Sequence, residues 1–125
     1  WGMDKVIICG DRHWTDYKLI LSVIEGFNNS TLVIVGGATG ADTLAGFAAE
    51  SQGYFVEVHP ANWLKYGKAA GPIRNQEMLD RNPDYVIAFH DDIENSKGTK
   101  DMITRAKKAG VEVRLVTHSN YGSRY

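Results

Sequence analysis

The sequence predicts an α/β fold built on a doubly wound parallel sheet, and three observations carry this prediction. Short apolar runs rich in β-branched residues alternate along the chain with longer segments whose apolar residues recur at helical spacing. Several of these runs are apolar at every position, as in parallel strands that are buried on both faces. Glycine and polar residues follow the ends of the runs. We therefore expect a Rossmann-like, doubly wound three-layer sandwich of about five parallel strands in the order 3-2-1-4-5.

The same patterns place the elements along the chain. Strands are expected at residues 5–9, 32–35, 54–58, 85–89 and 111–116. Helices are expected at about residues 16–27, 40–50, 72–81 and 98–109. Thr15 is the expected N-cap of the first helix, and Gly53 and Gly110 are expected to end the second and fourth helices. The connection at residues 59–73 is long, which is typical of functional or mobile segments.

The length of 125 residues predicts one domain with a core of its own. We place this single domain at residues 3–117. The terminal segments, residues 1–2 and 118–125, are expected to be flexible because chain ends fray unless they are tied down.

Composition argues against several classes of partner. The chain has 14 Lys and Arg residues against 15 Asp and Glu residues, a net charge of −1. Such a balance gives no general attraction to nucleic acid or to an anionic membrane, so neither is an expected partner. No apolar run is long enough to span a bilayer. Cys9, the one cysteine, lies in an apolar run, so we expect a reduced, buried thiol and a cytoplasmic protein.

The stretch at residues 33–42 is the most informative part of the sequence. An apolar strand runs through Gly36, Gly37 and Gly40 into an alanine-rich helix. Backbone N–H groups and the helix dipole at such a turn favour an anion, and glycines let a ligand approach the backbone. Thr39 and Asp42 have the spacing of a capping box. We expect this turn to bind the phosphate of a nucleotide or a related small molecule; a tight turn without a ligand is the alternative.

Two further loops are expected beside this turn. In the predicted strand order the switch point lies between the first and fourth strands, and ligands bind there beyond the carboxyl ends. Residues 10–14 and 90–99 would converge at this point with residues 36–40. A second helix start at Gly98 would then face the same crevice and take a second phosphate or a carboxylate. The predicted ligand-binding residues are Gly10, Arg12, Gly36, Gly37, Thr39, Gly40, Lys68, Arg74, Asn75, Ser96, Gly98 and Thr99.

Cationic side chains complete the predicted site. Arg74 is expected in the first turn of the third helix, where a positive charge opposes the helix dipole unless it contacts an anion. Arg12 directly follows the first strand and could clamp a phosphate or stack on a base. Lys68 lies in the long connection. The alternative for each is a solvated surface charge. The four histidines lack metal-ligand spacing, so we expect no metal, and no cofactor other than the nucleotide-type ligand.

Several motifs together resemble one protein family. They are GGATGAD at 36–42, HPANW at 59–63, GKAAGPIRN at 67–75 and SKGT at 96–99. The chain resembles the YspA-like, cpYpsA-related branch of the SLOG superfamily over residues 3 to about 116. This resemblance implies a Rossmann-like sensor of nucleotides or nucleotide-derived ligands in bacteria or phages, acting in defence or nucleotide signalling. It also implies a homodimer or higher homo-oligomer.

The superfamily includes the LOG phosphoribohydrolases, which cleave the N-glycosidic bond of nucleoside monophosphates, and the DNA-processing protein DprA. RNQEM at residues 74–78 is similar to the LOG segment that carries a catalytic arginine, which makes Arg74 the matching residue. KGT at 97–99 is similar to the LOG glycine-threonine motif, but Met102 stands where those enzymes have a catalytic glutamate. Because methionine cannot exchange protons, Asp42 and Asp101 are the remaining carboxylate candidates for catalysis beside Arg74.

The leading prediction is therefore a protein that binds a nucleotide or a nucleotide-derived ligand, without an expectation of catalysis. The alternative is N-glycosidic hydrolysis of a nucleoside monophosphate, in which Arg74 would hold the phosphate and Asp42 or Asp101 would act as the carboxylate. A third hypothesis, an interaction module that contacts DNA, is opposed by the near-neutral charge.

Overall fold

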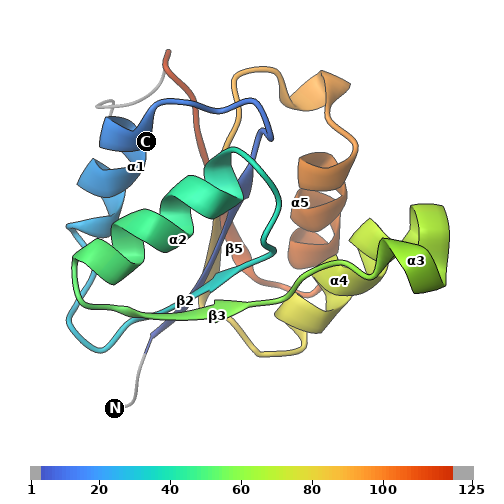
Figure 1. The fold of residues 1–125 in the computed structure, drawn as a ribbon, viewed down its shortest axis with the longest axis horizontal. Coiled ribbons are helices and arrows are strands. Elements are labelled where there is room, and N and C mark those ends of the chain that lie inside the picture. The colour runs from blue at the N-terminus through green and yellow to red at the C-terminus, as the bar shows by residue number, and fades with distance from the viewer. Residues whose placement is uncertain (1–3, 120–125) are drawn as a thin grey trace.

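The computed structural model describes residues 4–119 and confirms the predicted architecture (Figure 1). Within this range, five strands form one parallel sheet in the order β3-β2-β1-β4-β5. The strands are β1 Lys5–Gly10, β2 Leu32–Val35, β3 Phe55–Val58, β4 Tyr85–Phe89 and β5 Glu112–Val116. The helices are α1 Tyr17–Ile24, α2 Ala41–Ser51, α3 Trp63–Tyr66, α4 Ala70–Leu79 and α5 Gly98–Lys108, with short 3-10 helices η1 Gly67–Ala69 and η2 Ile93–Asn95.

Helices cover both faces of the sheet, with α1 and α2 on one side and α4 and α5 on the other (Figure 1). Successive residues of β1 enter different cores: Val6 and Ile8 pack toward α1 and α2, whereas Ile7 and Cys9 pack toward α4 and α5. The central strands β1, β2 and β4 are therefore buried on both faces, which explains why they are apolar at every position. This arrangement brings the carboxyl ends of the strands, and the loops that follow them, to one end of the molecule.

The first helix differs from the prediction at both ends. Asp16, not Thr15, is its N-cap, because the Asp16 Oδ1 accepts a hydrogen bond from the Leu19 amide (3.1 Å). The helix also ends at Ile24 rather than near Phe27. Gly26, a poor helix former, lies in the turn that follows.

The third predicted helix begins earlier than expected, and the connection before it is partly helical. α4 starts at Ala70, after the short helices α3 and η1. Arg74 therefore lies in the second turn of α4. The predicted conflict between Arg74 and the helix dipole is wrong, because that effect falls off within the first turn.

The predicted flexible termini fall mostly outside the described residues, since residues 1–3 and 120–125 are not described. His118 and Ser119 are described, and His118 makes several contacts that are treated below. The flexibility of the segment from residue 118 onward stays a prediction. Among the helices within residues 4–119, none combines the length and the hydropathy needed to cross a membrane.

Candidate functional site

The Gly36 peptide lies at the carboxyl end of β2, where helices from both faces of the sheet meet. Asp42 of α2 accepts a hydrogen bond from the Gly36 amide (3.0 Å), and Arg74 Nη1 of α4 donates to the Gly36 carbonyl oxygen (2.6 Å). A Cβ atom at Gly36 would lie 2.4 Å from Arg74 Nη1 and 2.8 Å from Asp42 Oδ2. Glycine alone leaves room for both side chains. We refer to Gly36, Asp42 and Arg74 as the Gly36 clamp.

The carboxyl group of the clamp is buried, with Asp42 only 4% exposed. Burial raises the pKa of Asp42 to about 6, and the Arg74 guanidinium and the amides of Gly36 and Ala38 limit this rise. The predicted capping box with Thr39 is not formed, because the Asp42 carboxylate accepts from Gly36 instead and Gly40 is the N-cap of α2. Asp42 therefore braces the loop before its own helix.

Glycines bring two loops and the end of β4 together at the backbone level. A Cβ atom at Gly40 would lie 2.4 Å from the carbonyl carbon and oxygen of Arg12, and one at Gly10 would lie 2.3 Å from the Phe89 carbonyl oxygen. The Ala41 amide donates to the Asp11 carbonyl oxygen (3.0 Å). The loops at residues 10–14 and 36–40 thus pack directly against each other, beside the end of β4.

An open hollow of about 280 Å³ lies at the start of α2. Its lining comes from the loop before α1, the glycine turn and the first turn of α2, and consists of Trp14, Thr15, Thr39, Gly40, Thr43 and Leu44. We refer to it as the α2 hollow. Of the predicted ligand-binding residues, Thr39 and Gly40 line it directly.

Within the described chain, α2 begins at this hollow without a side-chain cap, since Gly40 is its N-cap. The Ala41 amide donates to the Asp11 carbonyl oxygen, and the Leu44 amide donates to the Gly40 carbonyl oxygen (3.0 Å) as the first hydrogen bond within the helix. The amides of Asp42 and Thr43, between these two, belong to the helix start and have no acceptor within the helix. Together with the helix dipole they form a place for an anion.

The second predicted helix start is occupied by the protein itself. Ser96 Oγ accepts a hydrogen bond from the Thr99 amide (3.1 Å), so it caps the first turn of α5. Thr99 is buried, and neither residue lines the α2 hollow. A ligand group would have to compete with Ser96 for this amide.

Asn75 joins the Gly36 clamp to α5. Its Oδ1 accepts from Arg74 Nε (3.1 Å), and its Nδ2 donates to the Gly98 carbonyl oxygen (3.3 Å) and to Asp101 Oδ2 (3.0 Å). Arg105 Nε donates to the same Asp101 oxygen (2.9 Å). Asp101, a catalytic candidate from the sequence, is therefore held between two donors.

Five predicted ligand-binding residues are exposed: Arg12, Gly37, Thr39, Lys68 and Gly98. Arg12 and Gly37 lie in the two packed loops, and Lys68 lies in η1, away from the lining of the α2 hollow. The Arg12 side chain makes a long contact from Nε to His13 Nε2 (3.4 Å). The Arg12 backbone packs against Gly40, which lines the hollow.

The remaining reactive candidates are buried or engaged. Met102 is 1% exposed and belongs to the core between the sheet and α5. Cys9 is buried as predicted, and burial raises the pKa of its thiol far above the ordinary value, which makes a thiolate unfavourable. In residues 4–119, no three His, Cys, Asp or Glu side chains come close enough together to hold a metal ion.

Sequence reasoning missed part of the surroundings of the hollow. Trp14, Thr15, Thr43 and Leu44 line it but are not among the predicted ligand-binding residues. Trp14 is 5% exposed and packs edge-on against Phe89 with ring centroids 5.7 Å apart. The position of Trp14 shortly after the first strand was the one feature of the sequence that could have placed it at the hollow.

Comparisons with known proteins agree with this architecture. The sequence pattern of the YspA, cpYpsA-related SLOG family matches residues 4–66. The Gene 61 protein of Mycobacterium phage D29 is 34% identical over 120 residues, which cover 89% of this chain and 94% of the phage protein. DNA processing protein A (DprA) from Streptococcus pneumoniae superposes with a TM-score of 0.74 over 90% of this chain at 22% identity. The chain spans 50% of the length of that structure, and the likeness at this identity shows a shared fold. The chain belongs to the YspA, cpYpsA-related SLOG family.

Proposed function

We propose that the chain binds a nucleotide or a nucleotide-derived ligand, with an anionic group of the ligand at the start of α2. The observation that carries the proposal is the α2 hollow, which opens where no side chain of the described residues caps the helix. Anions bind at helix starts because backbone N–H groups and the dipole both favour negative charge. The nucleotide character of the ligand rests on the resemblance to the SLOG superfamily, as does a role in nucleotide signalling or defence.

The size and lining of the hollow favour a small ligand. Its volume of about 280 Å³ lies near the lower end of the range of roughly 300–1,000 Å³ that is typical of small-molecule sites. A mononucleotide therefore fits better than a dinucleotide. Thr39 offers an exposed hydroxyl, Leu44 offers apolar surface, and Arg12 supplies positive charge from the adjoining loop. In this proposal the Gly36 clamp shapes the loop, and its two charged side chains do not contact the ligand.

Isothermal titration with nucleoside 5′-monophosphates, and with inorganic phosphate alone, tests the proposal. We expect Thr39→Glu to weaken binding at least about tenfold, because like charges juxtaposed at a binding site are costly. An acidic residue near a helix start also stabilises the helix, so the variant should fold. Thr104→Glu, an exposed site in α5, is the charge-matched control and should bind like the wild type. Folded protein that binds none of these compounds at millimolar concentration would contradict the proposal.

The proposal stops at binding and does not extend to N-glycosidic hydrolysis. The position of the LOG glutamate holds the buried Met102, and Asp101 and Asp42 are both committed to hydrogen bonds within the protein. Chromatography of the same mixtures for released free base checks this point, since release would favour the hydrolase alternative.

We also propose that the chain forms a homodimer through the free edge of β3. The large hydrophobic side chains that are exposed within residues 4–119 are Phe47, Phe55, Val58, Trp63, Leu64 and Tyr66. All six belong to α2, β3 or α3. In the sheet formed by the described residues, β3 has a neighbouring strand on one side only, so its outer N–H and C=O groups can pair with β3 of a second copy about a two-fold axis. The charge of Glu57 on this strand is compensated by Arg81 (2.7 Å), so like-charge repulsion between the copies is small.

Replacing Phe55, which is 76% exposed on β3, by lysine should convert the dimer into a monomer. Each copy would carry a lysine on the pairing strand in place of apolar surface, which is how natural edge strands avoid pairing. Size-exclusion chromatography with light scattering measures the change, and Thr104→Lys is the control that should remain dimeric. A wild-type chain that is monomeric at high concentration would overturn this proposal and leave the ligand proposal intact.

A further inference from the structure

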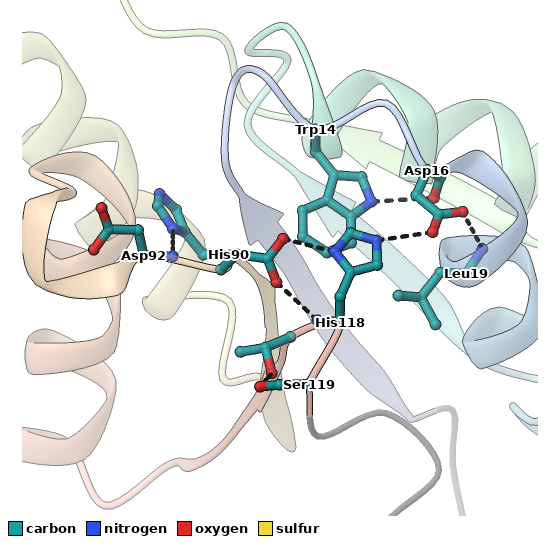
Figure 2. A network of polar contacts seen from close by, with 9 residues as sticks. Trp14, Asp16, Leu19, His90, Asp92, His118 and Ser119 are labelled. Carbon is teal, nitrogen blue, oxygen red and sulfur yellow. Dashed lines mark hydrogen bonds and ion pairs between the residues drawn. The ribbon is translucent and has the colours of Figure 1, made fainter.

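One histidine ties the segment after β5 to two other parts of the molecule (Figure 2). The His118 ring lies with Nδ1 2.6 Å from Asp91 Oδ2 and with Nε2 2.9 Å from Asp16 Oδ2. The His118 backbone amide also donates to Asp91 Oδ1 (2.7 Å), so Asp91 holds both the main chain and the ring. Asp16 lies at the start of α1 and Asp91 directly follows β4. We refer to His118, Asp16 and Asp91 as the His118 latch.

The geometry of the latch favours a protonated imidazole. A neutral imidazole has one N–H donor, so one of its two nitrogens would face a carboxylate with a lone pair. An imidazolium donates from both nitrogens, and each carboxylate then accepts one charge-assisted hydrogen bond. Both distances therefore fit the charged ring.

The latch also fixes a wall of the α2 hollow. The His118 ring is stacked on the Trp14 indole, with centroids 4.6 Å apart and planes 11° apart (Figure 2). The Trp14 indole Nε1 donates to the Asp16 carbonyl oxygen (3.1 Å), so the same residue holds the indole and the imidazole. Stacking of a cationic ring on an indole face is favourable. Trp14 in turn lines the hollow together with Thr15.

We propose that His118 is a positioning residue for the α2 hollow: in its protonated form it latches the segment after β5 onto Asp16 and Asp91 and holds Trp14 in place as a wall of the hollow. The consequence for ligand binding rests on the proposed function, whereas the latch itself can be tested without a ligand. Loss of the proton leaves one of the two carboxylates without its donor, so alkaline pH releases the latch.

Charged and titratable groups from two segments surround the latch, and its two carboxylates favour the charged ring. From α1 come Asp16 and Lys18, and from the segment after β4 come His90, Asp91 and Asp92. The hydrogen bonds to Asp91 and Asp16 raise the pKa of His118, and the His118 bonds lower the pKa of both carboxyl groups. The latch stabilises the fold fully below the ordinary histidine value of 6.5 and loses this effect as the pH rises through the raised pKa. At the acid end it is lost below the ordinary aspartate value of 3.8.

A pH titration followed by NMR tests the latch in the full chain without ligand. We expect the His118 imidazole resonances to titrate with a midpoint above 6.5 and the Trp14 indole N–H resonance to shift with the same midpoint. In Asp91→Asn the His118 midpoint should fall, because one charged acceptor is lost. In His118→Gln the Trp14 resonance should no longer follow this transition.

Asp92→Asn is the matched control, because Asp92 neighbours Asp91 but its carboxylate accepts from Asn95 (2.7 Å) and not from His118. This variant should keep the wild-type midpoint of His118 within a few tenths of a pH unit. A wild-type midpoint at or below 6.5, or a Trp14 resonance that does not follow His118, would overturn the proposal. Either result would leave calorimetric evidence for ligand binding unaffected, so the two proposals fail separately.

Discussion

Gly40→Ala should destabilise the fold by about 3 kcal/mol or more, the largest effect we expect from adding one methyl group. Gly40 has φ 78° and ψ −128°, a conformation that residues with a side chain rarely adopt. The added Cβ would also lie 2.4 Å from the carbonyl carbon and oxygen of Arg12 and from the Asp11 carbonyl oxygen. These are backbone atoms that cannot rotate away, so the loops at residues 10–14 and 36–40 would have to separate. Urea denaturation measures the loss.

Substitutions at two other glycines distinguish the cost of backbone strain from the cost of a steric clash. Gly53 has φ 85° but open space around its Cβ position, so Gly53→Ala should cost about 1 kcal/mol through strain alone. Gly46 lies within α2, also with open space, and Gly46→Ala should stabilise the fold by about 0.5–1 kcal/mol because alanine is the better helix former. If Gly40→Ala cost no more than Gly53→Ala, the close contact between the two loops would be refuted.

Asp42→Asn should become more stable relative to the wild type as the pH rises from about 4 to about 7, by up to about 3 kcal/mol. The pKa of Asp42 is raised from 3.8 to about 6, mainly by burial. A raised carboxyl pKa means that the folded state binds the proton more tightly than the unfolded state. The wild type therefore loses stability as the pH rises through this interval, whereas asparagine does not ionise and can still accept from the Gly36 amide. Urea denaturation at a series of pH values gives the two curves.

Glu57→Gln provides a control in which the stability relative to the wild type changes with pH in the opposite direction. Hydrogen bonds from Arg81 and His59 lower the pKa of Glu57 from 4.5 to about 2. The wild type should therefore gain stability over Glu57→Gln as the pH rises through the interval from about 2 to 4.5. Parallel curves for the wild type and Asp42→Asn between pH 4 and 7 would show that the Asp42 carboxyl is not desolvated as the structure indicates.

The identity of each element could be predicted because it depends on local patterns, and the strand order followed from the known topologies of doubly wound sheets. β2 and β4 begin and end at the predicted residues, since an apolar run bounded by polar or glycine residues is a strong signal for a buried strand. The predicted first residues and caps of the helices were less accurate. Thr15 was predicted as the cap of the first helix, whereas the hydrogen bond from the Leu19 amide goes to its neighbour Asp16.

Roles within the candidate site were harder to predict than its location. Asp42 and Arg74 were predicted as site residues, and in the structure both hold the Gly36 peptide; the hydrogen bond from Arg74 joins residues 38 positions apart. Ser96 was expected to offer its hydroxyl to a ligand and instead accepts from the Thr99 amide. Residue type and spacing show that a polar group is available. They do not show whether another group of the protein already forms a hydrogen bond with it.

The sequence by itself determined the doubly wound sheet, the glycine turn at residues 36–40 and its place at the carboxyl end of a buried strand, because side-chain periodicity and glycine's backbone freedom are local properties. Only the tertiary structure decided that α2 presents an uncapped start and that α5 does not. It also decided that His118 lies on Trp14 and between two carboxylates, one of them 102 residues away. Such contacts depend on how helices and strand ends pack in three dimensions, and no pattern along the chain encodes them.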